Sequence, residues 1–135
     1  MLNPYYVTGL VNGEGIFTYT KMGGNVYPYF AIKGAKSDLA LFEKVKMFFS
    51  SGAIYKVTAS SILLKIYRMD ELIQFMWHFL DYPLEGKKAE AFKVWKEMVM
   101  IKAVNRKEDW PKLHELAIAL SKANGGKTKR PRKRK

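Results

Sequence analysis

The sequence predicts an α+β domain in which one antiparallel sheet carries its helices on a single face. Two observations predict this fold. Two pairs of alternating polar and apolar segments are each separated by a short turn, and each pair is followed by apolar residues at helical spacing. A short helix precedes the first pair. Strand, strand, helix repeated twice places the helices against one face of a shared sheet and leaves the other face open.

The composition is consistent with one folded domain. Of the 135 residues, 48% are hydrophobic and 14% are aromatic, which is ample for a core. No apolar run approaches the roughly 20 residues of a membrane helix, and the first residues lack the layout of a signal peptide. The absence of cysteine excludes disulfides, thiol catalysis and cysteine-based zinc sites. His78 and His114 show no ligand spacing, so we interpret both as ordinary helix residues.

The first helix is predicted over residues 4–12. Asn3 supplies the N-cap, and Pro4 takes the first helical position, where its missing N–H costs nothing. This helix runs into Glu14, which stands between two glycines. A carboxylate at a helix C-terminus faces the negative end of the helix dipole, which costs about 0.3 kcal/mol or more unless a cation offsets it. A bound metal ion would provide that cation.

Two glycines of the same segment, Gly9 and Gly13, form a G-x-x-x-G pattern. This spacing leaves two positions without side chains on one face of the helix and lets another backbone approach closely. The pattern is best known from membrane helices, but the geometry holds for any tightly packed helix pair. The first helix is therefore expected to pack against a partner.

The first hairpin is predicted from residues 16–21 and 27–33, on either side of a turn that contains two glycines. Its core face is expected to carry Phe17, Tyr19, Pro28, Phe30 and Ile32. The second hairpin is predicted from residues near 53–58 and 62–67. Its second strand is expected to bury Ile62, Leu64 and Ile66.

Helices are predicted after each hairpin. Ser37 is expected to cap a helix that runs to Phe49, with Leu41, Val45 and Phe48 facing inward. The remaining helices are predicted over residues 70–80, 87–103 and 109–122, and a break at residues 82–86 separates the first two. The helix over residues 87–103 is expected to turn Phe92, Trp95 and Val99 inward.

The alternation also predicts which residues occupy the open face of the sheet. They are Thr18, Thr20, Tyr27, Tyr29, Lys33, Ile54, Lys56, Thr58, Leu63, Lys65 and Tyr67. Hydroxyls, lysines and aromatic rings suit contacts to phosphates and base edges in a wide groove better than they suit a small-molecule pocket. The same residue types are common on any solvated strand, so the alternation alone leaves both interpretations open.

The net charge of +12 is concentrated at one end of the chain. Residues 127–135 hold seven of the 24 basic residues and no acidic one. We expect residues 1–124 to form the domain and residues 125–135 to form a basic, disordered tail. Such a tail suits nonspecific binding to phosphates, and a nuclear-import signal has the same composition, so the tail does not decide the compartment.

Residues 7–15 resemble the LAGLIDADG motif of homing endonucleases, through Gly9, Leu10, Gly13, Glu14 and Gly15, with Phe17 two positions on. The resemblance extends over residues 4–124. Its later landmarks follow in the family's order and are Phe30-Ala31-Ile32 followed by Asp38, Gly52-Ala53-Ile54-Tyr55, and Tyr82-Pro83-Leu84 followed by Lys87-Lys88. The motif occurs once, so the chain is similar to the single-motif, homodimeric members.

The resemblance implies a specific architecture. It implies an αββαββα fold with a saddle-shaped antiparallel sheet, in which the motif helices of two subunits pack against each other. The homodimer would bind a long, pseudo-palindromic DNA duplex in its major groove. The residues implied at the dimer interface are Val7, Gly9, Leu10 and Gly13. Those implied in DNA binding on the open face are Thr18, Thr20, Asn25, Tyr27, Tyr29, Lys33, Lys56, Thr58, Lys65 and Tyr67.

The resemblance also implies a chemistry. Glu14 matches the catalytic acid, which with the carbonyl of Gly13 would hold Mg²⁺, for which Mn²⁺ can substitute, over the scissile phosphates. The family's lysine falls after Tyr82-Pro83-Leu84, with Lys88 as the first choice and Lys87 as the second. The implied activity is cleavage of both DNA strands to promote intron mobility. The implied setting is inside the cell, in a prokaryotic cytoplasm or an organelle.

Two residues depart from the family pattern. Asn12 stands where the motif usually has its first Asp, a position that does not bind metal. Gly34 stands where many members carry a Gln that organises water in the active site, which predicts slow cleavage. Two alternatives therefore stay open: a maturase that assists splicing of a group I intron RNA, and a noncatalytic DNA-binding protein on the same fold.

Overall fold

The computed structural model describes residues 1–125, so nearly all of the predicted basic tail lies outside the described residues. The elements run in the order α1 (Pro4–Glu14), β1 (Gly15–Met22), β2 (Asn25–Ala35), α2 (Leu39–Phe49), β3 (Ala53–Lys56), β4 (Ser61–Ile66), α3 (Met69–Asp81), α4 (Gly86–Val104) and α5 (Trp110–Ala123). The predicted order of helices and hairpins is confirmed.

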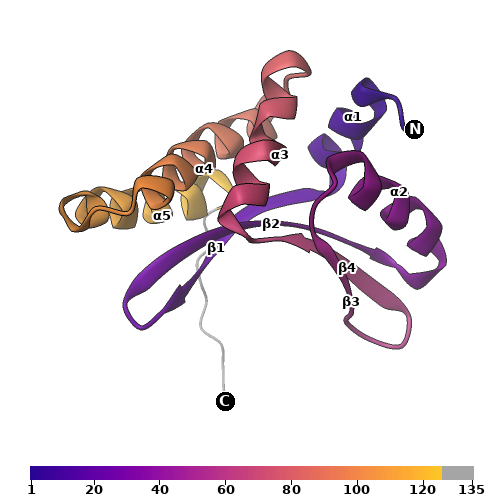
Figure 1. Ribbon diagram of the computed structural model, residues 1–135, viewed down its shortest axis with the longest axis horizontal. Coiled ribbons are helices and arrows are strands. Elements are labelled where there is room, and N and C mark those ends of the chain that lie inside the picture. Colours follow the sequence, from indigo (N-terminus) through magenta and orange to yellow (C-terminus); the bar gives the residue numbers. More distant parts are fainter. Residues whose placement is uncertain (126–135) are drawn as a thin grey trace.

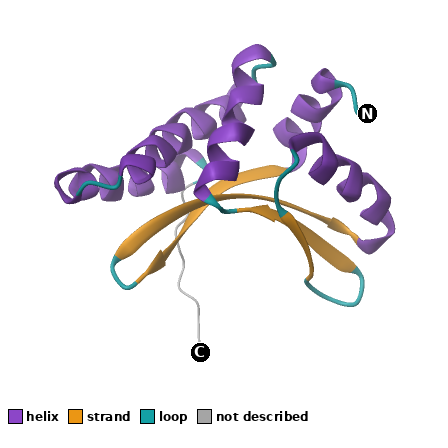
Figure 2. Ribbon diagram, viewed as in Figure 1, coloured by secondary structure: helices purple, strands orange, loops and turns teal. Residues whose placement is uncertain are grey.

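The four strands form one antiparallel sheet with the order β1-β2-β4-β3. The two hairpins join through β2 and β4, so the sheet crosses the whole molecule (Figure 1). The helices of residues 1–125 all lie on the convex side of this arched sheet, and none of them covers its concave side (Figure 2). The predicted fold class, a saddle-shaped sheet with helices on one face, is confirmed.

Helix α1 begins as its sequence predicts. The side chain of Asn3 accepts hydrogen bonds from the backbone N–H groups of Tyr5 at 2.8 Å and Tyr6 at 3.4 Å, which satisfies two of the free donors at the helix start. The helix continues two residues beyond its predicted end and stops at Glu14. Strand β1 follows with no intervening loop, so the end of α1 lies directly at the beginning of the sheet.

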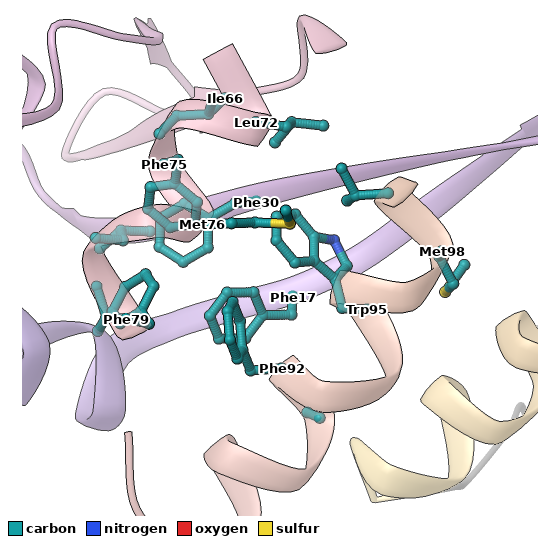
Figure 3. Packing of buried hydrophobic residues seen from close by; sticks show 14 of the residues in the cluster. Phe17, Phe30, Ile66, Leu72, Phe75, Met76, Phe79, Phe92, Trp95 and Met98 are labelled. Carbon is teal, nitrogen blue, oxygen red and sulfur yellow. The ribbon is translucent and has the colours of Figure 1, made fainter. Parts of the chain in front are cut away.

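An aromatic cluster fills the space between the sheet and the helices (Figure 3). The ring centroids of Phe30 and Phe75 are 4.4 Å apart, and those of Phe17 and Trp95 are 5.0 Å apart. The indole N–H of the fully buried Trp95 donates to the carbonyls of Thr18 and Tyr29, at 3.1 and 3.0 Å. Helix α4 is therefore fixed to β1 and β2 by hydrogen bonds as well as by packing.

The prediction for the helix after the first hairpin needs two corrections. Ser37 does not cap it, because residues 36–38 form a separate 3₁₀ turn before the α-helix begins at Leu39. Val45 is buried as predicted, but Phe42 and Phe49 are buried in place of Leu41 and Phe48, which are only partly buried. The packing of Phe42 on β2 decides which side of the helix faces the sheet. The spacing of apolar residues alone does not predict this contact.

The contact of Phe42 explains a glycine in the sheet. A Cβ atom at Gly34 would lie 2.6 Å from Cζ of Phe42, which is closer than real side-chain contacts allow. Gly34 pairs with Ile62, whose side chain is buried on the helix-covered side of the sheet. A glutamine at this position would therefore collide with α2, so packing accounts for Gly34.

Among the helices in the described part of the chain, none combines the length and apolar character needed to cross a membrane.

Candidate active site and nucleic-acid interface

The candidate active site lies where α1 meets β1. Gly13 and Glu14 form the last positions of α1, and both are exposed. Gly15 begins β1 and is buried, and a Cβ there would lie 2.8 Å from both the Phe30 ring and the side chain of Val11. Only glycine fits this close approach. The helix can therefore turn directly into the strand and present the Glu14 carboxylate at the junction.

Lys88 in the first turns of α4 reaches the same junction. Its ammonium group donates to the backbone carbonyl of Gly15. Partial burial lowers the pKa of Lys88, and the negative charge of Glu14 acts in the opposite direction. The positive charge of Lys88 thus lies near an acidic helix end that has no basic residue in its own last turn. Lys87 is exposed, and of the two lysines only Lys88 is hydrogen-bonded at this junction within the described residues.

Two side chains of α1 fix this helix to the rest of the chain. The side-chain oxygen of Asn12 accepts a hydrogen bond of 2.8 Å from the backbone N–H of Glu85, the residue before α4. The hydroxyl of Thr8 donates to the carbonyl of Tyr82 at 2.8 Å and lies 2.8 Å from Nε2 of His78. The hydroxyl has one hydrogen, so the histidine nitrogen is its donor. Asn12 and Thr8 together set the position of Glu14 relative to α4.

The exposed side of α1 carries the glycines of the proposed dimer contact. No heavy atom of residues 1–125 lies within 4 Å of a Cβ built at Gly9 or at Gly13, so this part of the chain leaves both positions open. Val7, which was assigned to the same interface, is completely buried in the core of its own chain, so that assignment is wrong. Leu10 is partly buried and packs against the core from the edge of the exposed side.

The open face of the sheet is basic and rich in hydroxyl groups. Directly paired residues share a face, and the pairs Thr18 with Tyr29 and Thr20 with Tyr27 place these four side chains together on the uncovered side. Their neighbour Lys65 has its ammonium group 4.4 Å from the centre of the Tyr29 ring. The face therefore combines positive charge with hydrogen-bonding groups and aromatic surface.

The other predicted DNA-binding residues divide into two groups. Lys33 is paired with Leu63 on the open face, and Asn25 lies at the start of β2, opposite Met22. Tyr67 follows β4 and is exposed, with its ring 5.5 Å from the Lys65 ammonium. These residues join the open face as the alternation predicts.

The predicted placement is wrong for the residues of β3. Ile54 and Lys56 pair with Leu64 and Ile62, so both lie on the helix-covered side rather than the open one. Thr58 lies beyond the strand, where its hydroxyl is 2.8 Å from that of Ser61. Strand β3 has only four residues, and its face is decided by pairing with β4 rather than by its own weak alternation.

Sequence reasoning did not place Tyr55 on the open face. Tyr55 pairs with Leu63 and is exposed on the uncovered side. The clear alternation of β4 could have revealed it, because the face of β3 follows once its register against β4 is known.

The donor set at the junction fits a hard divalent ion. The described residues contain no group of three or more His, Asp or Glu side chains that could hold a metal on their own. Mg²⁺ does not need such a group, because it is commonly held by one or two carboxylates together with substrate phosphates and water. Glu14 offers one exposed carboxylate, and Gly13 offers a carbonyl from the last turn of α1, where carbonyls lack helical partners.

An exposed carboxylate and a lysine beside a basic, open sheet are typical of proteins that act on the backbone of nucleic acids. Comparison with known protein families narrows this class. The family model described as LAGLIDADG endonuclease matches residues 7–99. The chain therefore belongs to the LAGLIDADG endonuclease family, and the resemblance deduced from the motif is confirmed.

Relatives and solved structures agree with this family. The chain is 30% identical over 125 residues to "Probable intron-encoded endonuclease 3" of Neurospora crassa, which covers 87% of this chain and 21% of the relative. The LAGLIDADG meganuclease I-AabMI, bound to uncleaved DNA, superposes with a TM-score of 0.83 and 29% identity over 87% of this chain and 44% of its own. The homing endonuclease I-TnaI superposes with a TM-score of 0.79 and 25% identity over 92% of this chain and 97% of its own. The chain thus spans about a fifth of the curated relative.

Proposed function

We propose that this chain is a Mg²⁺-dependent, site-specific DNA endonuclease that works as a homodimer on a long, pseudo-palindromic duplex and promotes intron mobility. The observation that carries the proposal is the junction of α1 and β1, where Lys88 donates to Gly15 beside the exposed carboxylate of Glu14. The structure of the related I-AabMI with uncleaved DNA supports a duplex as the substrate.

The open face of the sheet would hold the DNA. Its concave shape suits the convex surface of a duplex (Figure 2). Lys33 and Lys65 would contact phosphates or base acceptors, and the hydroxyls of Thr18 and Thr20 can both donate and accept hydrogen bonds to base edges. Because the sheet and the end of α1 are continuous, binding on this face would bring a phosphate toward Glu14.

Glu14 and the Gly13 carbonyl would hold Mg²⁺, which when bound polarises the scissile phosphate and lowers the pKa of an attacking water. The Lys88 ammonium would stabilise the negative charge that develops on the phosphate oxygens. Its bond to Gly15 holds this group near the junction before substrate binds. Lys87, which is exposed and one residue earlier on the helix, would contribute little.

Two subunits would supply the two sites needed to cut both strands. Gly9 and Gly13 leave two positions on the outer side of α1 without side chains, so two copies of this helix can approach each other closely there. A twofold axis at this contact would place one Glu14 from each subunit near the centre of the joined sheets. The same symmetry requires a target with two related half-sites.

The test compares binding with cleavage. Duplexes that bind the protein are first recovered from a randomised library in the presence of Ca²⁺, and the selected duplex is then incubated with Mg²⁺. The variant Glu14→Gln should bind this duplex with unchanged affinity and lose more than about 100-fold in cleavage rate, because it loses a metal ligand. Glu90→Gln changes an exposed glutamate of α4 and serves as the matched control.

The two lysines provide a second matched pair. Lys88→Met should slow cleavage by about 100-fold, as expected for loss of a positioned group that stabilises transition-state charge, whereas Lys87→Met should leave the rate within about twofold. Cleavage by Glu14→Gln at the wild-type rate would contradict the assignment of the acid. A wild-type protein that binds a selected duplex but never nicks it would instead indicate the noncatalytic alternative.

A further inference from the structure

A cavity of about 530 Å³ opens on the uncovered face of the sheet, away from the junction that carries Glu14. Its walls are mainly apolar and aromatic, and they include Met22, Tyr27, Tyr29, Tyr55, Leu63 and Tyr67. These residues come from all four strands or the residues that follow them, so the cavity is a feature of the assembled sheet. A surface that only contacts phosphates has no need of such walls.

Duplex DNA offers one apolar group to a protein in the major groove. Each base presents hydrogen-bond donors and acceptors there, and thymine adds its 5-methyl group, which packs on apolar side chains. Leu63 lies at the centre of the open face, opposite Tyr55 on β3 and Lys33 on β2. It therefore supplies an aliphatic contact that a methyl group can reach and that a hydrogen-bonding group would not favour.

The arginine that most often reads guanine is not among the residues that line the cavity. Lysine also reads guanine, but the lysine of the cavity, Lys65, lies with its ammonium over the Tyr29 ring. Within residues 1–125 the arginines are Arg68 and Arg106, and neither lines the cavity. Both are held by carboxylates, Arg68 by Asp70 at 3.2 Å and Arg106 by Asp109 at 3.3 Å.

The Tyr29 ring is poorly placed for stacking with an unpaired base. The Lys65 ammonium already lies 4.4 Å from the centre of this ring and covers a face that a base would need. Lys65 also lines the cavity, so its positive charge favours a duplex there.

We infer that this cavity reads thymine in duplex DNA through its 5-methyl group and so sets sequence preference in each half-site. The inference rests on the proposed function, because it requires that the open face bind a duplex. It assigns this role to Leu63 with Tyr55, a residue that the alternation of the sequence did not place on this face. Thymines are expected at the positions of the target that face the cavity.

The experiment replaces thymine by deoxyuridine, which removes only the methyl group. In the duplex selected by the wild-type protein, each thymine is replaced in turn, and the affinity is measured with Ca²⁺. One or two positions per half-site should lose about fourfold in affinity, the value of one buried methyl group. Methylated cytosine at the same positions should bind better than unmodified cytosine.

A variant pair then connects the effect to the cavity. Leu63→Ser should bind the thymine and deoxyuridine duplexes equally well at the sensitive positions. Leu80→Ser, which changes an exposed leucine of α3 on the helix side, should keep the fourfold difference. The deoxyuridine scan itself uses the wild-type protein, so poor folding of a variant leaves the main result intact.

Each outcome separates this inference from the proposed function. A selected duplex with equal affinity for thymine and deoxyuridine at every position would overturn the inference and leave the endonuclease proposal standing. Failure to select any duplex would contradict the proposed function and, with it, the inference. Tighter binding of single-stranded RNA than of the selected duplex would also overturn the inference, since it would show that the cavity takes unpaired bases.

Discussion

The two sides of helix α1 differ in how many contacts they make with the rest of their own chain. On the inner side Val7 and Val11 are fully buried, and Thr8 is hydrogen-bonded to α3 and to the segment that follows it. On the outer side Gly9 and Gly13 have no neighbours within 4 Å of a built Cβ. One helix therefore belongs to the core on one side and is left without a partner on the other.

This difference assigns separate tasks to residues that are adjacent in sequence. The inner side fixes the helix in position, so that its end meets β1 and Lys88 at one place. On the outer side, Gly9 and Gly13 make no side-chain contact with the other described residues, so these two positions are free to serve association. Substitutions on the two sides should therefore affect different measurements.

The largest effect is expected on the outer side. Gly13→Leu places a large side chain where two helices would meet and should weaken dimerisation by about 5- to 150-fold, because overpacking of a close contact costs about 1–3 kcal/mol. The isolated chain should lose no stability and gain about 0.5–1 kcal/mol, since glycine is a poor helix former and this position is open. Light scattering gives the mass and thermal unfolding gives the stability.

The control for this variant comes from the inner side. Val7→Ala removes two buried methyl groups, so it should lower the free energy of unfolding by about 2 kcal/mol and leave the mass unchanged. A Gly13→Leu protein that remains dimeric would refute the interface. A Val7→Ala protein that dissociates while remaining folded would show that the inner side also governs association, which contradicts the separate roles of the two sides.

The sequence predicted the outer side of α1 better than the inner one. The spacing of Gly9 and Gly13 and the carboxylate at the helix end can be read directly from the amino-acid sequence. The burial of Val7 cannot be read from it, because it depends on which side of the helix faces the sheet. With few polar residues in α1, the apolar pattern alone does not define that side.

The same reasoning explains which parts of the sheet were predictable. Strand β4 alternates strictly over six residues, and its buried set of Ile62, Leu64 and Ile66 is confirmed. Strand β3 is too short for its pattern to fix its face, so Ile54 and Lys56 were misplaced. The hydrogen bonds that position the site, such as Asn12 with Glu85, join residues 73 positions apart and have no local signal.

The next effect is expected on the inner side, at Thr8. Thr8→Val keeps the shape of the side chain but removes the hydroxyl, which leaves the Tyr82 carbonyl and the His78 ring without their partner. The variant should be less stable by about 1–3 kcal/mol. Thr20→Val on the open face has no such bonds among the described residues and should change stability by less than about 0.5 kcal/mol.

Thermal unfolding of the two threonine variants checks this prediction. Cleavage should also separate them, since a loosened α1 would move Glu14 relative to Lys88, and near-attack geometry is sensitive to displacements of about 1 Å. Equal stability of both variants would mean that the hydrogen bonds of Thr8 contribute nothing net, and that burial of Val7 and Val11 alone fixes the helix.

The smallest effect is expected from acid, through His78 on the same inner contact. Burial lowers the pKa of His78 below its ordinary value of 6.5, although the charge of Asp81 and the nearby Pro4 carbonyl act in the opposite direction. The unfolded chain therefore binds more protons than the folded one between these two pKa values. Stability should fall as the pH falls from 6.5 through that window, and stay constant with respect to this group below it.

The variant His78→Gln isolates this effect. In this variant the loss of stability between pH 7 and pH 5 should be smaller than in the wild type. An unchanged acid dependence in His78→Gln would show that the ring is protonated without strain. The inner side of α1 would then tolerate a charge, and only its apolar residues would distinguish it from the outer side.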